Sequence, residues 1–406
     1  MRRIRKAAAA VGVGLLTLAG QQALAGAESR PDSGATGTVL HDGFSGYPRM
    51  VRLAHSGAAN GRIVASVSGD VSPGHNAGLI FESTDEGKSF RKIADVPDVP
   101  ETDGTGVCCG SLYELPRKVG TMPAGTLLRA ATVGATAPAA EREVRQRVWR
   151  SDDHGRTWRH LSDMAVTPDH AKAWEPELSV TEDGRLAGYY SDESDKDEHS
   201  QKLVKVISSD GVDWSRPEDL IIHKKQSVRP GMAIVRKLPN GTWFMAYEVC
   251  NIDTRFQCSI YFRKSSDGWD WGDPSDLGTE VRTAKGRYAL HTPNVAWSPG
   301  PGPDGTLLLV SEMLVEKDGG LAPGNAKTVL TNQQLGKGPW HEMQAPVRVD
   351  GVEDSGCENF SPSLLPSTDG KKVLEMSTDY FAKDDCRSYF ATGKVTLPPA
   401  SGHGRP

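Results

Sequence analysis

A short motif that recurs along the chain constrains the fold more than any other feature. Its consensus is Ser-x-Asp-x-Gly-x-Thr-Trp, and its copies begin at Ser83, Ser151, Ser208 and Ser265. Each copy follows a run with β character, and its Asp and Gly suit a tight turn in which the carboxylate accepts local backbone N–H groups. We therefore interpret the motif as a hairpin turn of a repeated unit. Its aspartates are structural in this interpretation, and they are Asp85, Asp153, Asp210 and Asp267.

A second pattern precedes each motif and gives the number of units. It is a strand with Pro or Ser near its start, followed by a Gly-containing turn and another strand. Its markers are Pro48, Ser111, Pro176, Pro230, Pro293 and Pro362. Six units of about sixty residues, each with room for four strands, predict an all-β fold, a six-bladed β-propeller. The last two units lack a clean motif, and Gly336–Trp340 is interpreted as a degenerate copy.

The N-terminus has the features of a secretory signal. Residues 1–25 combine a basic start, an apolar run from Ala7 to Leu18 and the small-x-small sequence Ala23-Leu24-Ala25. The apolar run is too short to span a bilayer comfortably. We therefore expect a secreted, extracellular protein without a membrane segment after cleavage. The predicted boundaries are a signal peptide at 1–25, a flexible segment at 26–39, the propeller at 40–398 and a tail at 399–406.

Six cysteines follow the leader, an even number that suits an oxidising compartment. Cys250 and Cys258 flank a short loop and are placed to staple a hairpin, and Cys357 and Cys386 are placed to clip the last segment. For the adjacent Cys108 and Cys109, a vicinal disulfide and two free thiols both stay open. No cysteine or histidine spacing indicates zinc.

The charge of the chain indicates which classes of binding partner to expect. The formal net charge is -5, and no basic run follows the leader, so nucleic acid is not an expected partner. We expect a monomer that acts on an oligosaccharide or polysaccharide and needs no cofactor or metal. Calcium at the acidic loop 192–198 stays open.

Propeller geometry places the chemistry where the innermost strand of each blade begins and where the second strand ends. Glu175 lies in Trp174-Glu175-Pro176, and Glu248 ends the apolar run that begins at Trp243. Glycoside hydrolysis requires two carboxyl groups across one bond, one of them with a raised pKa. We predict Glu175 and Glu248 as this pair. The alternative is that each is a structural ion-pair partner of Arg229 or Arg49.

The motif copies resemble the Asp-boxes of the sialidase superfamily of six-bladed propellers, which specify the fold well and the activity poorly. The segments Trp174-Glu175-Pro176, Tyr189 to Glu193, His199 to Leu203, Arg229 to Met232 and Met245 to Glu248, together with Tyr47-Pro48-Arg49, resemble glycoside hydrolase family 93. This resemblance implies a retaining exo-α-1,5-L-arabinanase that releases arabinobiose from linear arabinan and uses two glutamates. We assign Glu248 as the nucleophile and Glu175 as the acid/base, and the reverse assignment stays open.

Further residues at the same strand ends are predicted to bind substrate. They are Tyr47, Arg49, Asp70, Trp174, Tyr190, Asp192, Gln201, Arg229, Tyr247, His291, Asn359 and Tyr380. For the aromatic residues the competing interpretation is a place in the core. For Arg229 and Arg49 it is pairing between blades, and for His291 a structural role.

Two other functions stay open. An exo-α-sialidase binds a carboxylate with three arginines and uses a Tyr nucleophile. Here Arg49 and Arg229 have no clear third partner, since His291 and Asn359 occupy the later positions. A non-catalytic glycan-binding propeller needs the aromatic and arginine residues but not the paired glutamates.

Overall fold

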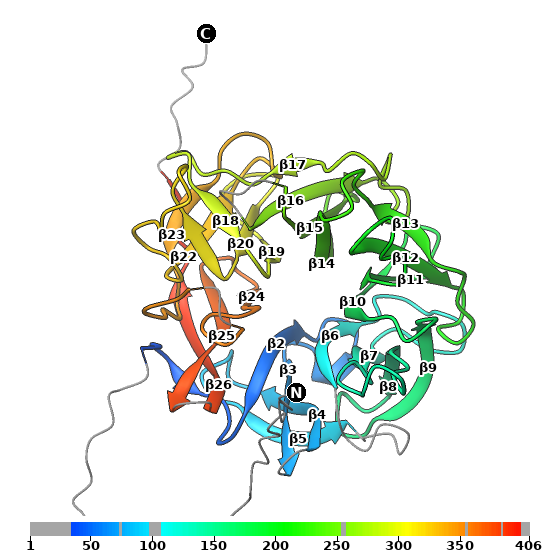
Figure 1. Cartoon of the computed structure of the whole chain (residues 1–406). Coiled ribbons are helices and arrows are strands. Elements are labelled where there is room, and N and C mark those ends of the chain that lie inside the picture. Colours follow the sequence, from blue (N-terminus) through cyan, green and yellow to red (C-terminus); the bar gives the residue numbers. More distant parts are fainter. Residues whose placement is uncertain are drawn as a thin grey trace, which may run out of the picture. The chain divides into compact units, whose positions relative to one another are not determined.

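The computed structural model describes residues 34–72, 75–96, 107–252, 257–353, 356–382 and 385–398. Its strands form six antiparallel sheets arranged in a ring (Figure 1), which confirms the predicted six-bladed β-propeller. The predicted signal peptide and tail lie outside the described residues. Within these residues, no helix has the length and hydropathy needed to span a bilayer.

Blades one to three follow one another along the chain and have the same strand order. Blade one contains β2 (Ser45–Arg52), β3 (Ile63–Ser72), β4 (His75–Ser83) and β5 (Arg91–Val96), with the 3-10 helix η1 (Gly57–Ala59) between β2 and β3. Blade two contains β6 (Cys108–Glu114), β7 (Leu127–Val133), β8 (Arg145–Ser151) and β9 (Arg159–Val166). Blade three contains β10 (Ala173–Val180), β11 (Leu186–Asp192), β12 (Lys202–Ser208) and β13 (Glu218–Ile221).

The outer edge of blade four includes a strand from the chain segment of blade five. Blade four contains β14 (Arg229–Lys237), β15 (Trp243–Cys250) and β16 (Cys258–Ser265), and its sheet continues through β17 (Thr279–Glu280), β18 (Tyr288–Leu290) and β21 (Met313–Val315). Blade five contains β19 (Asn294–Ser298), β20 (Thr306–Val310), β22 (Thr328–Asn332) and β23 (His341–Gln344). The strand β21 follows β20 along the chain but pairs with β18 in the sheet of blade four.

Blade six joins the two ends of the described chain. It contains β24 (Ser363–Pro366), β25 (Lys372–Ala382) and β26 (Asp385–Lys394), and its outermost strand is β1 (Thr38–Val39). Thr38 pairs with Phe390 and Val39 with Tyr389, so the ring is closed by main-chain hydrogen bonds. The strand β1 lies just before residue 40, where the predicted propeller begins.

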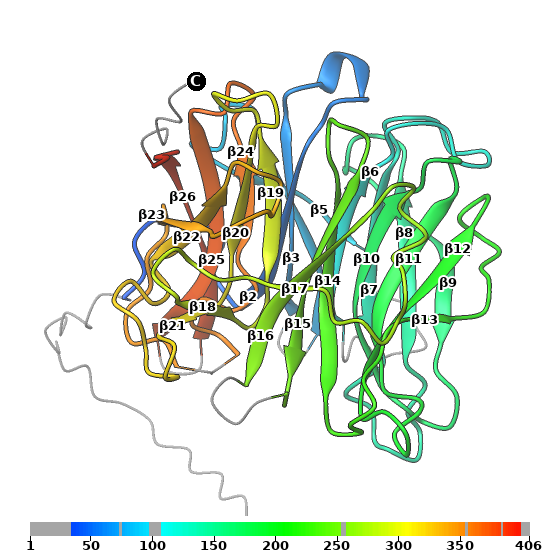
Figure 2. The same cartoon turned by 90° about the horizontal axis from the view of Figure 1, so that it is seen from above.

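The innermost strands run along the axis of the ring (Figure 2) and share an irregularity at their start. In blades one to four the pairing register of the inner strand shifts after its first residues, as at Gly46/Arg49 and Trp174/Glu177. At each start a non-glycine residue has a positive φ, a conformation that L-residues rarely adopt. We call these six residues the mouth ring, and they are Tyr47, Cys109, Glu175, Met232, His291 and Asn359. The end of the propeller that carries them is called the mouth.

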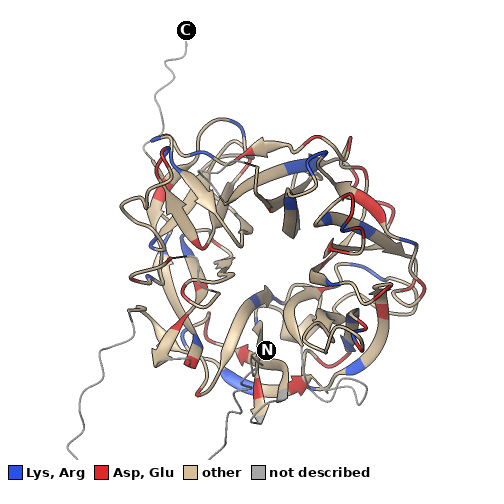
Figure 3. Cartoon of the chain, in the orientation of Figure 1, with Lys and Arg blue, Asp and Glu red and all other residues tan. Residues whose placement is uncertain are grey.

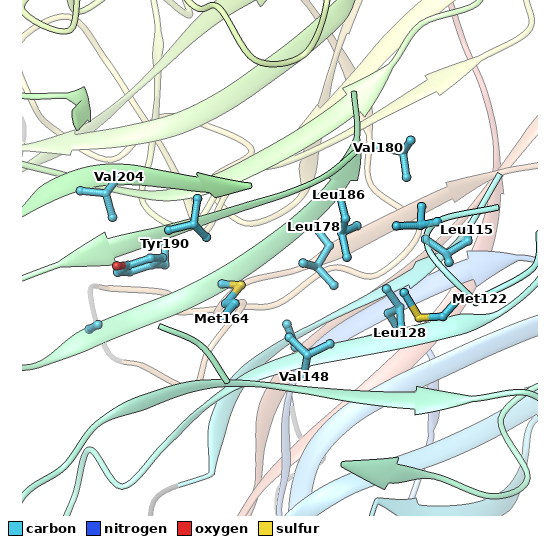
Figure 4. Packing of buried hydrophobic residues seen from close by; sticks show 14 of the residues in the cluster. Leu115, Met122, Leu128, Val148, Met164, Leu178, Val180, Leu186, Tyr190 and Val204 are labelled. Atoms are coloured by element: carbon cyan, nitrogen blue, oxygen red, sulfur yellow. The ribbon is translucent and has the colours of Figure 1, made fainter. Parts of the chain in front are cut away.

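The hydrophobic core lies between the blades. Figure 4 shows the cluster in which Leu128 and Val148 of blade two pack against Leu178 and Leu186 of blade three. These side chains are at most 1% exposed, and burying each contributes about 1.5–3 kcal/mol. Strands buried on both faces in this way explain the apolar runs of the sequence. Acidic and basic residues lie interspersed around the ring (Figure 3).

The recurring motif has the predicted turn geometry. In its clearest copy, Asp153 accepts hydrogen bonds from the backbone N–H groups of Arg156 and Thr157, at 3.0 and 2.9 Å. The turn joins β8 to β9, at the end of the blade opposite the mouth. The degenerate copy lies at the same place in blade five, where Asn332 accepts from the N–H of Gly336.

All six cysteines form disulfides within the described residues. Cys250 and Cys258 are directly paired across β15 and β16, and Cys357 is joined to Cys386. Cys108 and Cys109 form a vicinal disulfide at the start of β6. The predicted pairings of the first two disulfides are confirmed, and the question left open for Cys108 and Cys109 is answered.

Candidate active site

Glu175 lies at the mouth, on the shifted register at the start of β10. Its backbone has a φ of 51°, and its Oε2 accepts a hydrogen bond of 2.7 Å from the Oγ of Ser191 on β11. Burial raises the pKa of Glu175 to about 8, although the bond from Ser191 lowers it, and the charge of Glu248 adds to the rise. Glu175 is therefore mostly protonated at neutral pH and suited to donate a proton.

Glu248 lies near the end of β15, the second strand of blade four, and is 8% exposed. Its Oε2 accepts a hydrogen bond of 2.8 Å from the backbone N–H of Thr292, and the Nδ1 of His291 lies 4.0 Å from the same oxygen. The Sγ of Cys250 lies 3.6 Å from Oε1. A backbone N–H that donates to a carboxylate favours its ionised form. Glu248 is thus suited to act as a nucleophile.

Thr292 holds its N–H toward Glu248 through a strained backbone. Its φ is 45°, a genuine outlier for a β-branched residue. Its Oγ1 accepts a bond of 3.0 Å from the N–H of Ser361 in blade six, which fixes the segment. Strain of this kind persists where the surrounding structure over-determines it, and it clusters at functional sites.

Glu175 and Glu248 share one electrostatic environment with Tyr47 of blade one. Burial raises the pKa of Tyr47, the charge of Arg49 opposes the rise, and the charges of Glu175 and Glu248 add to it. The Arg49 guanidinium lies 4.2 Å from the centre of the Tyr47 ring and donates to the Oγ of Ser361 at 2.9 Å. Residues from blades one, three and four therefore meet at the mouth.

A second charged group at the mouth is centred on Arg229. Its Nη2 donates to Glu193 at 2.7 Å and to the side-chain oxygen of Gln201 at 2.6 Å. The Nε1 of Trp174 donates to the same Glu193 oxygen at 3.2 Å. Burial raises the pKa of Glu193, but the bond and charge of Arg229 outweigh it, so the pKa lies below its usual value. The pair Arg229–Glu193 positions Trp174 beside Glu175.

The two arginines weighed as ion-pair partners of the candidate glutamates are hydrogen-bonded to other groups. Arg229 is bound to Glu193, and Arg49 is bound to Ser361 and to the carbonyl of Pro48. The neighbouring carboxylate Glu177 is the one that forms a structural pair, with Arg236 at 2.6 Å.

Two predicted sugar-stacking residues belong to the core instead. Tyr190 is 3% exposed and packs in the cluster between blades two and three, and Tyr247 is fully buried, with its hydroxyl donating to the carbonyl of Leu277. Neither ring offers a face to a sugar, so their assignment as binding residues is corrected. Both faces of these strands are covered by neighbouring blades, so alternation along the strand does not distinguish a mouth residue from a core residue.

The remaining predicted binding residues are placed as follows. Gln201 and Asn359 are buried and hydrogen-bonded, Gln201 to the carbonyl of Pro230 and Asn359 to those of Ser311 and Glu312. Asp192 bonds to Ser194 in its own loop. Asp70 lies near the end of β3, where burial raises its pKa, and Tyr380 is 38% exposed on β25.

Three residues of the site were not among the predicted ones. Ser191 and Glu193 lie in the segment Tyr189 to Glu193, so their place at the end of an inner-blade strand was available as a signal. Thr292 has no such signal, because its contribution comes from a backbone N–H in a left-handed conformation.

A cavity of about 450 Å³ lies at the other end of the inner strands. It is lined by residues at or just beyond the ends of these strands, including Arg52, Arg117 and Arg236. Its acidic residue Glu114 is occupied by the N–H groups of Ala54 and His55. Because it offers no pair of carboxyl groups, we place the chemistry at the mouth.

Among the described residues, two side-chain groups have the composition of a metal site. Glu248, Cys258 and His291 come within 4.8 Å of one another, but the sulfur of Cys258 is bonded to Cys250. Asp195, Glu198 and His199 cluster in the loop for which calcium was left open. Acidic groups of this kind are common without an ion, so calcium there stays a hypothesis.

Comparison with known proteins identifies a family and similar solved structures. A BNR repeat-like domain matches residues 38–282. The structure of a Penicillium chrysogenum alpha-L-arabinanase complexed with arabinobiose is 25% identical, with 88% of this chain and 98% of that chain covered and a TM-score of 0.72. A Fusarium graminearum alpha-L-arabinofuranosidase of glycoside hydrolase family 93, solved with arabinobiose, is 24% identical, with 89% and 97% covered and a TM-score of 0.72. The same Fusarium enzyme with an iminosugar inhibitor is 25% identical, with 89% and 98% covered and a TM-score of 0.71. No curated protein sequence matches the chain.

Proposed function

The chain belongs to the family of proteins with a BNR repeat-like domain, and from this premise we propose that it is a secreted, retaining exo-α-1,5-L-arabinanase. The likeness to propellers solved with arabinobiose or an iminosugar supports a glycosidase. The observation that carries the proposal is the pair Glu175 and Glu248, two carboxyl groups at one mouth with opposite surroundings. The pKa of Glu175 is raised, which favours its protonated form, and Glu248 accepts a hydrogen bond from a backbone N–H.

The proposed reaction has two steps. The Glu248 carboxylate attacks the anomeric carbon while Glu175 gives its proton to the glycosidic oxygen, so the leaving sugar departs as an alcohol and a glycosyl–enzyme ester forms. Glu175, now ionised, takes a proton from water, and the hydroxide oxygen displaces Glu248 from the anomeric carbon. The proton lost in the first step is thereby recovered, and configuration is retained.

The finer parts of the proposal rest on different observations. The leader and the even cysteine count support secretion, which the oxidised state of the six cysteines accommodates. The exo mode, the α-1,5 linkage and arabinobiose as product are proposed from the family resemblance and from the arabinobiose complexes of similar propellers. We propose that the protein acts as a monomer.

A product analysis tests the proposal. The mature protein is incubated with linear debranched arabinan and, separately, with sialyl-lactose, and the products are separated by chromatography. Arabinobiose from arabinan, with the α-anomer formed first in an NMR time course, is the expected result. Sialic acid release with intact arabinan would establish a sialidase instead, although Arg49 and Arg229 are both engaged by other groups.

Variants test the two roles. Glu175→Gln and Glu248→Gln should each lower kcat by about 10³-fold or more, while the melting temperature stays close to that of the wild type. A matched control is Glu182→Gln, an exposed glutamate that pairs with Lys237 in the turn between β10 and β11, at the end opposite the mouth, and it should keep kcat. An active Glu175→Gln/Glu248→Gln double variant would refute the assignment. Glycan binding without cleavage by the wild type would indicate a binding propeller.

A further inference from the structure

Arg129 on β7 is a fully buried arginine between blades one and two. It is 0% exposed, and its Nε donates to the Oγ of Ser66 on β3 at 3.1 Å. Its Nη1 and Nη2 are buried and have no hydrogen-bond acceptor in the described part of the chain. No carboxylate of the described residues forms an ion pair with it. A cation is thus buried with one neutral partner.

Two glycines make room for this guanidinium. A Cβ at Gly78 would lie 2.5 Å from its Nε, and a Cβ at Gly110 would lie 2.7 Å from its Nη2. Gly78 belongs to blade one and Gly110 to blade two. The guanidinium therefore lies against the backbone of both blades, at their seam, and a side chain at either glycine would displace it.

Two further polar groups face the same seam without a partner. Trp149 is the cross-strand neighbour of Arg129, its ring centre lies 5.5 Å from the guanidinium carbon, and its Nε1 is buried without an acceptor. Ser68 pairs with Gly78 and projects from the same face of β3 as Ser66, and its Oγ is also buried without a partner. All of these groups can donate a hydrogen bond, and the described seam supplies no anionic acceptor.

A buried cation among hydrogen-bond donors favours binding of an anion. Arginine keeps its proton in proteins, and although burial lowers the pKa of Arg129, it falls only to about 10, so the group is charged at neutral pH. A buried charge without a counter-charge costs several kcal/mol. Because two backbones and an indole ring lie close to the guanidinium, we expect a single-atom ion there rather than phosphate or sulfate.

We propose that the seam between blades one and two binds a chloride ion, held by Arg129 with Trp149 and Ser68 as further donors. The ion joins the two blades next to the mouth. Gly110 directly follows the vicinal disulfide, and Ser66 pairs in register with Arg49. This site is separate from the proposed hydrolase chemistry. Binding of the ion is expected to stabilise the contact between blades one and two.

Halide-dependent unfolding tests the proposal in the full-length mature protein. The melting temperature is measured after dialysis into sodium gluconate and after replacement of gluconate by chloride at equal ionic strength. We expect a saturable rise of about 3 °C by about 100 mM chloride, and a similar rise with bromide. Arg129→Met should remove this rise. Arg159→Met, the same change at an exposed arginine of blade two that pairs with Asp152, should keep it.

A second measurement does not depend on whether Arg129→Met folds. Wild-type crystals are soaked in sodium bromide, and the anomalous difference map is calculated. A bromide peak at the Arg129 guanidinium, between the two blades, supports the proposal. The proposal is overturned by water molecules there, by a carboxylate of the chain in contact with the guanidinium, or by a melting temperature of the wild type that is independent of halide. Arabinan hydrolysis enters neither measurement, so the test is independent of the proposed function.

Discussion

The hydrogen bond between Ser191 and Glu175 makes the pH dependence of the reaction testable. The Oγ of Ser191 donates to Oε2 at 2.7 Å, and a donor to a carboxylate favours its ionised form. It therefore lowers the pKa of Glu175, against burial, which raises it to about 8. In Ser191→Ala this donor is lost, and the pKa of Glu175 rises further.

The size of the change follows from the strength of the bond. A hydrogen bond to a charged group contributes about 1.5–3 kcal/mol, and about 1.4 kcal/mol corresponds to a tenfold change in the acid equilibrium. The lower end applies here, because Ser191 also accepts the N–H of Met232, at 3.2 Å, and relaxation of that contact offsets part of the effect. We expect the pKa of Glu175 to rise by about one pH unit.

The assay is the pH profile of kcat/KM on linear arabino-oligosaccharides. Glu175 must be protonated to donate, so activity falls as the pH rises through its pKa, and the alkaline limb lies near pH 8 in the wild type. In Ser191→Ala this limb should move upward by about one unit, while the acidic limb stays in place. The control is Ser367→Ala, in the turn between β24 and β25 at the end of blade six opposite the mouth. It should leave both limbs of the pH profile in place. An alkaline limb that stays or moves downward in a folded variant refutes the role of Glu175 as the acid. A ¹³C NMR titration of Glu175 reports the same pKa without a substrate.

Three further predictions concern stability and support of the site. The Glu375 carboxyl is buried, with one bond from the N–H of Val347, and burial raises its pKa to about 8. The wild type therefore loses stability as the pH rises from about 4.5 through 8. Glu375→Gln should gain about 4 kcal/mol of unfolding free energy relative to the wild type between pH 5 and pH 9, measured by urea unfolding. Asp153→Ala should lower the unfolding free energy by about 2 kcal/mol, because two turn N–H groups lose their acceptor. It should leave kcat unchanged, since the turn lies opposite the mouth. A lower kcat in a fully folded variant would contradict this. Replacing Cys250 and Cys258 by serine should cost about 2.5 kcal/mol and also lower kcat, because the disulfide contacts Glu248; an unchanged kcat would show that the sulfur has no positioning role.

The fold could be predicted because residues that form turns mark each repeat in the sequence. Four of the six markers lie inside inner strands, and Pro293 and Pro362 lie directly before β19 and β24. The Asp-boxes fall between the third and outermost strands, where the Asp carboxylate satisfies turn N–H groups. These are local interactions, which a short sequence window specifies.

The missing motif of the last blade has a structural cause. In blade six the third strand, β26, is followed in the sheet by β1, from the opposite end of the chain. No hairpin joins them, so there is no turn for an Asp-box to form. In blade five the corresponding turn exists, and Asn332 accepts the N–H groups there in place of the usual Ser and Asp.

The site could be predicted in part. Glu175 and Glu248 stood out as carboxylates in apolar strands, and the structure brings them to one mouth. The sequence could not distinguish Tyr190 and Tyr247 from core residues. Neighbouring blades cover both faces of these strands, so side chains at odd and at even positions are buried alike. The contribution of Thr292 depends on a left-handed backbone that nothing in its own side chain indicates.

The pairing of β1 with β26 determines when the ring can close during synthesis. A ribosome delivers Thr38 long before Phe390, so β1 has no partner and the sixth sheet lacks β24, β25 and β26 until synthesis of the domain is nearly finished. Until then an unpaired edge is available to neighbouring chains. The contact of Arg49 with Ser361 is also unformed at that stage, so the mouth is assembled only when blade six is complete.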